Sequence, residues 1–475
     1  MPNAKSRFVS TTVSRILVAR VLVTRVLIIG LILLIGLPIG ANSLNAKVNT
    51  GIALIRDAEI EHSIRMYATP LFTAAGLGMD DVRVHIVASS EINAFVTGGR
   101  NIFVNTGLLL SSQSSGEILG VLAHETGHIL GGHLSATRDK MDTASTQMII
   151  ATLLGVAAMA GGQTDAGAAI TLGGSHLAQQ NLLKYSRTQE SIADQTAITL
   201  LREAGYSPAG LLTLLERLRG QEALVTARQD AYVRSHPLPR DRIGSLRAVV
   251  AKAPPGRSLA TFDVLLARIQ AKIFAFTENP GRTFRRYPDS DTSVAARYAR
   301  AIAYHRNNNR TAAINAIDEL LRMAPNDPYF HELKGQFLFE QGKAAAAVSV
   351  LKRAAELLPG QPLILLALGQ AEVATEDTAL NHEAIRHLQV AVEGEPRLAA
   401  AWRELSIATG RDGQLAASAL ASAEFAMLLR RPRDARMFAA RAAKQLPAGT
   451  PGNLRARDIL RALDRVREKQ KKKAN

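Results

Sequence analysis

Apolar residues recur with two different periods in the first half of this 475-residue chain. The segment Val82 to Val87 alternates apolar and polar side chains, as a half-buried strand does. Ala94 to Val104 predicts a β-hairpin that turns at Gly98-Gly99. Ile118 to Leu130 has the length and apolar content of a helix. We therefore expect a mainly α-helical protein that contains a small β-sheet.

Beyond a connector that carries Pro and Gly near residues 279–290, helical segments repeat with a period of 34 residues. In each unit a small residue lies in the first helix, another opens the second, an apolar residue follows and a proline closes the unit. The small residues of the first helix are Ala301, Gly335 and Gly369, and those that open the second are Ala313, Ala347 and Ala384. The apolar residues are Ile317, Leu351 and Leu388, and the closing prolines are Pro325, Pro359 and Pro396. The third unit is three residues longer, and we place the extra residues in the loop around Thr375 to Asn381. This is the tetratricopeptide (TPR) pattern, whose helix pairs stack because one repeat cannot bury its own apolar face.

The chain is too long for a single hydrophobic core. We expect a first domain over residues 42–280, a linker over 281–290 and an α-helical TPR solenoid over 291–470. Residues 1–41 predict a secretory signal peptide, because basic residues precede an uncharged run that ends in small residues at Gly40 and Ala41. The alternative is an uncleaved anchor, although the apolar run is short for a membrane span. Cysteine is absent, so no disulfide stabilises the chain.

The net charge of +16 does not indicate nucleic-acid binding. Five of the basic residues precede Val26, within the expected signal peptide. The basic tail over residues 465–473 contains no aromatic residue that could stack on bases. A solvated helix end is the simplest interpretation of this tail. The alternative is weak attraction to anionic lipid headgroups, which would be a peripheral membrane contact.

The strongest chemical signal is the sequence His124-Glu125-Thr126-Gly127-His128 inside the expected helix. Two histidines four residues apart lie about 40° apart around a helix, so both imidazoles can bind one Zn²⁺. Glu125 would lie beside the metal and accept a proton from water. These residues predict hydrolysis of a peptide bond. The alternative is a solvent-facing helix with two incidental histidines.

A third ligand is needed, and His133 is the nearest candidate in the sequence. On a continued helix His133 would lie about 140° from His128 and would face away from the metal. We therefore expect it to be a surface residue near a helix end at Gly131-Gly132.

Glu190 and Asp194 are the stronger candidates, because they are four residues apart and share one face of a second helix. We assign Glu190 to the metal and Asp194 to a hydrogen bond with a ligand histidine. Small Ala193 and Ala197 would let the second helix approach the first. The alternative is an exposed acidic helix with Arg187 as an ion-pair partner.

Two further segments carry a family resemblance together with these residues. They are Ser235-His236-Pro237-Leu238-Pro239-Arg240-Asp241-Arg242-Ile243 and Asn93-Ala94-Phe95-Val96-Thr97-Gly98-Gly99. In this order the motifs resemble the HtpX-type and CAAX-prenyl-protease-type gluzincin metallopeptidases over residues 50–250. The resemblance implies a zincin-like domain with one zinc ion held by His124, His128 and Glu190, with Glu125 as the general base and Asp194 beside a ligand. This chain lacks the long apolar spans of many members of that family.

The hairpin segment suggests a mode of substrate binding. An edge strand can hold an extended substrate by main-chain hydrogen bonds, and we expect Asn93 and Phe95 to flank the scissile bond. The alternatives are an ordinary turn residue for Asn93 and an ordinary core residue for Phe95.

His236 is expected to enter the active site from a loop that Pro237 and Pro239 stiffen and that Asp241 and Arg242 anchor at its far end. A protonated His236 would stabilise the oxyanion of the tetrahedral intermediate, whereas a neutral one would be a fourth zinc ligand that keeps the enzyme latent. We favour the fourth ligand, and the alternative to both roles is a histidine that only packs the loop. The insert over residues 143–183 lies between the ligand helices and is uncharged except for Asp165. It predicts a buried helical hairpin, a cover that controls access to the zinc, or a surface that meets a membrane or a partner.

A zinc peptidase joined to TPR repeats resembles periplasmic proteases of the BepA type, which act on outer-membrane β-barrel assembly. The resemblance implies a periplasmic location, misfolded or stalled envelope proteins as substrates, and the barrel-assembly machinery as a partner of the repeats. A different class stays open, namely a chaperone or assembly adaptor whose zinc site is latent or structural. The intact Glu125 favours the enzyme, because a structural zinc site needs no general base.

Overall fold

The computed structural model describes residues 53–78, 81–97, 99–133, 186–219, 231–236 and 240–474. The expected signal peptide and the insert over residues 143–183 lie outside these ranges. Within the described ranges, no helix combines the length and the apolar character that crossing a membrane requires.

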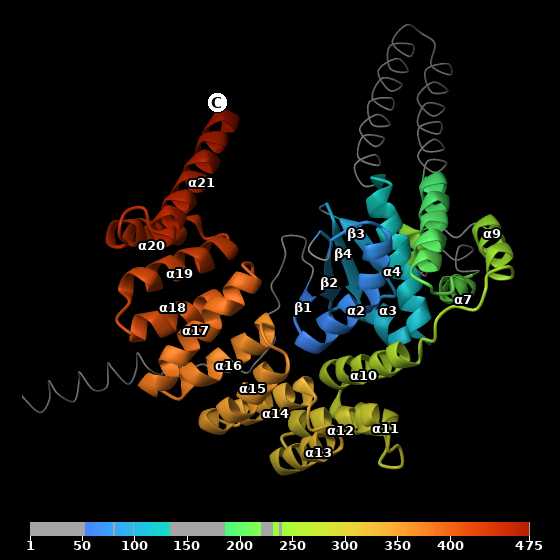
Figure 1. Cartoon of the computed structure of the whole chain (residues 1–475), viewed down its shortest axis with the longest axis horizontal. Helices are drawn as coiled ribbons and strands as arrows, with labels where there is room; N and C mark the ends of the chain where they lie inside the picture. The colour runs from blue at the N-terminus through green and yellow to red at the C-terminus, as the bar shows by residue number, and fades with distance from the viewer. Residues whose placement is uncertain are drawn as a thin grey trace, which may run out of the picture. The chain divides into compact units, whose positions relative to one another are not determined.

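A four-stranded sheet lies in the first part of the chain (Figure 1). Its strands are β1 (Leu54–Ile55), β2 (Arg83–Val87), β3 (Ala94–Thr97) and β4 (Asn101–Asn105), in the order β1-β2-β4-β3. Strands β3 and β4 form the predicted antiparallel hairpin, and β2 pairs with β4 in parallel. The hairpin and the strand expected from Val82 are therefore confirmed, and β3 is an edge strand.

Helices pack against this sheet around one hydrophobic core. They are α2 (Ala58–Ala74), α3 (Thr106–Ser111), α4 (Ser115–Leu130), a helix over residues 186–203, α7 (Ala209–Leu218), α8 (Ala231–Ser235) and α9 (Arg240–Val250). Glycines let two of them approach α4 closely. A Cβ on Gly120 would lie 2.7 Å from Leu211 Cβ of α7, and a Cβ on Gly127 would lie 2.8 Å from the carbonyl oxygen of Ala193. The predicted close approach at Ala193 is confirmed, and both Ala193 and Ala197 are fully buried.

The remaining helices form the repeat region (Figure 1). They follow α10 (Ala260–Thr277) and α11 (Pro280–Arg286) as α12 (Val294–Arg306), α13 (Arg310–Met323), α14 (Pro328–Glu340), α15 (Ala344–Leu357), α16 (Pro362–Ala374), α17 (Thr378–Gly394), α18 (Ala399–Arg411), α19 (Leu415–Leu428), α20 (Pro432–Gln445) and α21 (Pro451–Ala474). At the small residues of the repeat pattern, the two helices of a repeat pack closely against each other. A Cβ on Gly335 would lie 2.4 Å from Leu351, and one on Gly369 would lie 2.6 Å from Leu388, which are equivalent positions of successive repeats.

The three extra residues of the third unit are not in a loop, as the sequence suggested, but add a turn at the start of α17. This helix has 17 residues where α15 has 14. Asp377 caps it by accepting from the Leu380 N–H, and Asn381 is buried and donates to the Ala408 carbonyl at 3.0 Å. Within the helix, the backbone N–H and C=O groups of the added residues form hydrogen bonds with one another. A longer loop would not provide these bonds.

Helix α10 contacts both regions. Ala271 and Ala275 pack with the first repeat, and Lys272 is buried between the carboxylates of Asp57 and Glu59 at 2.8 and 3.2 Å. The predicted linker over residues 281–290 includes α11, which packs against α12. The domain boundary at residue 280 stays a prediction.

Candidate metal centre and active site

Helix α4 carries His124, Glu125 and His128 on one side, as the sequence predicted. The first two residues are fully buried, and His128 is half-buried. The helix over residues 186–203 brings Glu190 opposite them. Its carboxylate oxygens lie 3.2 Å from His124 Nε2 and 3.3 Å from His128 Nε2.

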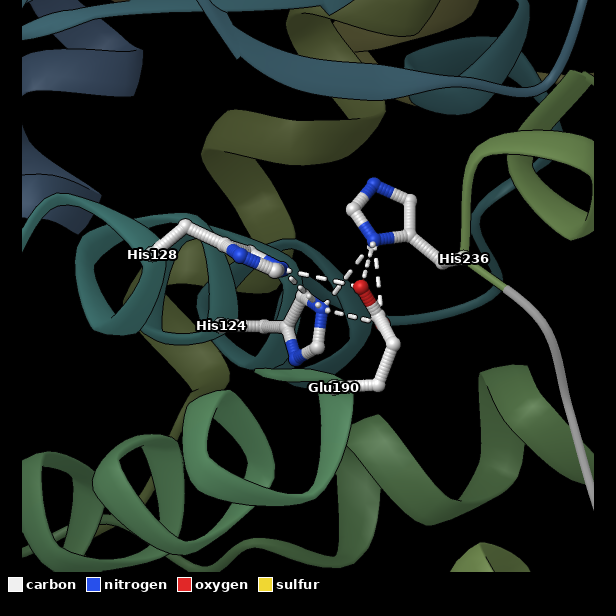
Figure 2. Close-up of side chains that lie close together, drawn as sticks. All are labelled: His124, His128, Glu190 and His236. Carbon is white, nitrogen blue, oxygen red and sulfur yellow. Dashed lines mark hydrogen bonds and ion pairs between the residues drawn. The ribbon is translucent and has the colours of Figure 1, made fainter. Parts of the chain in front are cut away.

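His236 completes a group of four side chains that converge on one point (Figure 2). One candidate ligand atom from each of His124, His128, Glu190 and His236 lies within 4.8 Å of all the others. His236 Nδ1 is 3.1 Å from Glu190 Oε2 and 3.3 Å from His124 Nε2. Three imidazole nitrogens and one carboxylate form a donor set suited to a divalent transition metal.

Glu125 provides an independent indication that the group holds a metal. Both of its carboxylate oxygens are buried and have no hydrogen-bond partner in the structure. Its Oε1 lies 3.4 Å from His236 Nε2. A buried carboxylate without hydrogen bonds is costly unless something occupies the neighbouring space. A metal and its water beside the four ligands would satisfy it.

Asp194 lies next to the group, as expected, and is held there by Arg242. Asp194 Oδ1 is 3.0 Å from His124 Nδ1, on the side of the ring away from Glu190. Arg242 donates to both Asp194 oxygens, from Nε at 2.7 Å and from Nη2 at 2.8 Å, and its Nη1 lies 3.0 Å from Glu190 Oε2. The sequence suggested only that Arg242 anchors a loop. Its partner Asp194 is 48 residues earlier, and no local pattern connects the two.

These contacts shift the pKa values of the buried groups. Burial alone lowers the pKa of His124, but Asp194 and Glu190 outweigh it and raise that pKa to about 10. Burial alone raises the pKa of Asp194, but His124 and Arg242 lower it to about 2. Burial likewise opposes the effect of the three histidines on Glu190, whose pKa falls well below its usual range. Both acids are therefore charged at neutral pH.

His133 is not the exposed surface residue that the sequence suggested. Only 6% of its surface is exposed, and its Nδ1 lies 2.9 Å from His128 Nδ1. The expectation assumed a continuous helix, but α4 ends at Leu130 and Gly132 takes a φ of +59°. This turn brings His133 back beside His128. The preceding Gly-Gly pair is the sequence signal that could have indicated it.

The two expected substrate contacts lie in different places. Asn93 directly precedes β3, and its Oδ1 accepts from Ser235 Oγ at 3.2 Å, so it adjoins the segment that carries His236. Phe95 stacks on Phe103 on the sheet face opposite Ala94, with ring centroids 5.2 Å apart. Binding of substrate by Asn93 and Phe95 stays a prediction.

The two parts of the chain match different sequence families. Residues 55–250 match the model of peptidase family M48, and residues 298–362 match a tetratricopeptide repeat model. Together with the site geometry, these matches show a metallopeptidase domain of the M48 type that is followed by TPR repeats.

The chain is similar to several proteases. The chain is 26% identical to the beta-barrel assembly-enhancing protease of Yersinia pestis, over 77% of this chain and 76% of that protein. The protein of the same name from Escherichia coli (strain K12) is 26% identical over 67% of this chain and 66% of its own length. Metalloprotease LoiP of E. coli is 28% identical over 41% of this chain.

Proposed function

We propose that the chain is a zinc-dependent endopeptidase that is exported to the periplasm and cleaves misfolded or stalled envelope proteins. The convergence of His124, His128 and Glu190 beside the unpartnered carboxylate of Glu125 carries the proposal. The similarity to two proteins named beta-barrel assembly-enhancing protease supports outer-membrane proteins as the substrate class. The repeats would dock these substrates or the barrel-assembly machinery, because TPR solenoids bind partner proteins.

Each residue of the site has a role in this reaction. His124, His128 and Glu190 would hold the zinc, which when bound polarises the substrate carbonyl and makes a water acidic. Glu125 accepts the proton of the attacking water and delivers it to the leaving amine. Asp194 holds His124 through Nδ1, so that the Nε2 lone pair faces the other ligands.

Strand β3 is suited to bind an extended substrate. Among the described residues β3 is an edge strand, so no other strand of that part of the chain pairs with its outer row of main-chain groups. Main-chain pairing needs little side-chain specificity, which suits cleavage of unfolded segments of many proteins. Asn93 would lie near the scissile bond, next to the segment that carries His236.

The replacement Glu125→Gln tests the proposal. It should keep zinc and lower hydrolysis of unfolded casein by about 10²- to 10⁴-fold, because it removes the base and leaves the ligands. Glu216→Gln is a control that also removes a carboxylate charge, since Glu216 on α7 lies in an exposed pair with Arg247 and outside the site. It should keep its activity. Equal casein hydrolysis by Glu125→Gln and the parent would refute the proposal and favour an adaptor with an idle metal site.

A further inference from the structure

We propose that His133 is a positioning residue, which holds the ring of His128 so that Nε2 faces the metal. This inference rests on the metal site of the proposed function. The two rings are nearly perpendicular, at 78°, with their Nδ1 atoms 2.9 Å apart. His128 Nε2 lies on the other side of its ring, 3.1 Å from His124 Nε2 and 3.3 Å from Glu190 Oε1.

The protons on the two rings follow from this geometry. A neutral imidazole has one N–H donor and one acceptor nitrogen. His128 must present an unprotonated Nε2 to bind a metal, so its proton is on Nδ1. His133 Nδ1 must then be the acceptor of that N–H. In ligand histidines the N–H of the second ring nitrogen commonly donates to a carboxylate or a carbonyl. Here an imidazole nitrogen is the acceptor.

The backbone conformation before His133 places this imidazole beside His128. Gly132 has a φ of +59°, which only glycine adopts without strain, and it turns the chain back toward α4. The ring of His133 lies over Gly131, where a Cβ would be 2.3 Å from His133 Nε2. Any side chain at position 131 would therefore displace the ring. Gln189 Nε2 donates to the His133 carbonyl at 3.1 Å and ties the turn to the helix that carries Glu190.

Of the two glycines, Gly131 meets a requirement that a simple helix end would not impose. A C-terminal glycine is needed for the turn, but the missing side chain at Gly131 is needed only because the imidazole lies there. The turn, the space over Gly131 and the bond from Gln189 all locate one acceptor nitrogen beside His128.

Two variants of nearly equal size separate the hydrogen bond from packing. His133→Asn keeps an oxygen near the position of Nδ1 that can accept from His128, whereas His133→Leu fills the space without an acceptor. We expect His133→Leu to bind zinc about 10- to 100-fold more weakly than the parent, as for other residues that orient metal ligands. His133→Asn should recover most of that affinity. The measurement is the zinc dissociation constant of the full-length protein, from competition with a chelating dye.

Equal zinc affinity of the Asn and Leu variants would overturn the inference, whether that common affinity is weaker than the parent's or the same. Circular dichroism of each metal-free variant verifies the fold, and His133→Gln replaces any variant that fails to fold. Because zinc binding is measured without substrate, the result is independent of peptidase activity. Loss of casein hydrolysis in Glu125→Gln tests the proposed function, and the His133 pair tests the positioning of His128.

Discussion

Replacing Arg242 by Met should destabilise the metal-free peptidase region strongly. Arg242 is 6% exposed, and its guanidinium makes two hydrogen bonds to Asp194 and a contact with Glu190. Met has a similar length and packs well, so the volume is nearly kept. What is lost is the positive charge between two buried carboxylates. Removing one partner of a buried ion pair costs about 3–5 kcal/mol, because the remaining charge has no compensation.

A matched control lies on the same helix. Arg247 on α9 pairs with Glu216, and the side chains of this pair are 55% and 38% exposed. Exposed pairs contribute about 0–1 kcal/mol, so Arg247→Met should change the stability little. The difference between the two variants isolates the effect of burial, since both replace an arginine in an ion pair by methionine.

Hydrogen exchange measured by mass spectrometry can follow this effect in one region. A loss of 3–5 kcal/mol would speed exchange of the α4 amides by about 10²- to 10³-fold or more in Arg242→Met without zinc. The single tryptophan, Trp402, lies in repeat helix α18, and its fluorescence should be unchanged. Equal protection of α4 in Arg242→Met and Arg247→Met would refute the reasoning.

Two other predictions concern the metal group. Zinc binding at pH 7 should release about one proton per chain, because His124 is protonated in the metal-free site, with a pKa of about 10, and must be neutral to bind metal. The apparent zinc affinity should therefore rise with pH up to about 10, and calorimetric heats that are equal in buffers of different ionisation enthalpy would contradict this. His236→Ala should raise basal casein hydrolysis without changing the zinc content; a fall would identify His236 as the oxyanion donor, and no change would leave it only a packing role.

The parts of the site that local spacing determines could be predicted from the sequence. The four-residue spacing of His124 and His128 and the acidic pair Glu190 and Asp194 each define one face of a helix. Once α4 and the second helix pack through Gly127 and Ala193, these faces must meet. The edge hairpin was likewise predictable, because alternation and the Gly-Gly turn are local signals.

The contacts that were missed depend on a change in chain direction. The expectation for His133 is wrong because the direction of its side chain is taken from a continued helix, whereas the chain turns at Gly132, which has a left-handed φ. Arg242 was given only a loop role because its carboxylate partners come from another helix. The extra turn of α17 was placed in a loop because insertions in repeats are more often tolerated between helices.

The main-chain carbonyl of Ala94 connects the proposed latency of the site with substrate binding. Just before β3 the Asn93 carbonyl accepts from the Asn105 N–H of β4, so the next carbonyl, that of Ala94, points away from β4. His236 Nε2 lies 3.3 Å from this oxygen. If a neutral His236 donates from Nε2 to the Ala94 carbonyl, its Nδ1 keeps a lone pair on the side of Glu190 and His124. The proposed fourth metal ligand requires that tautomer. A substrate strand that pairs with β3 would compete for the Ala94 oxygen and remove the bond that holds His236 in this position.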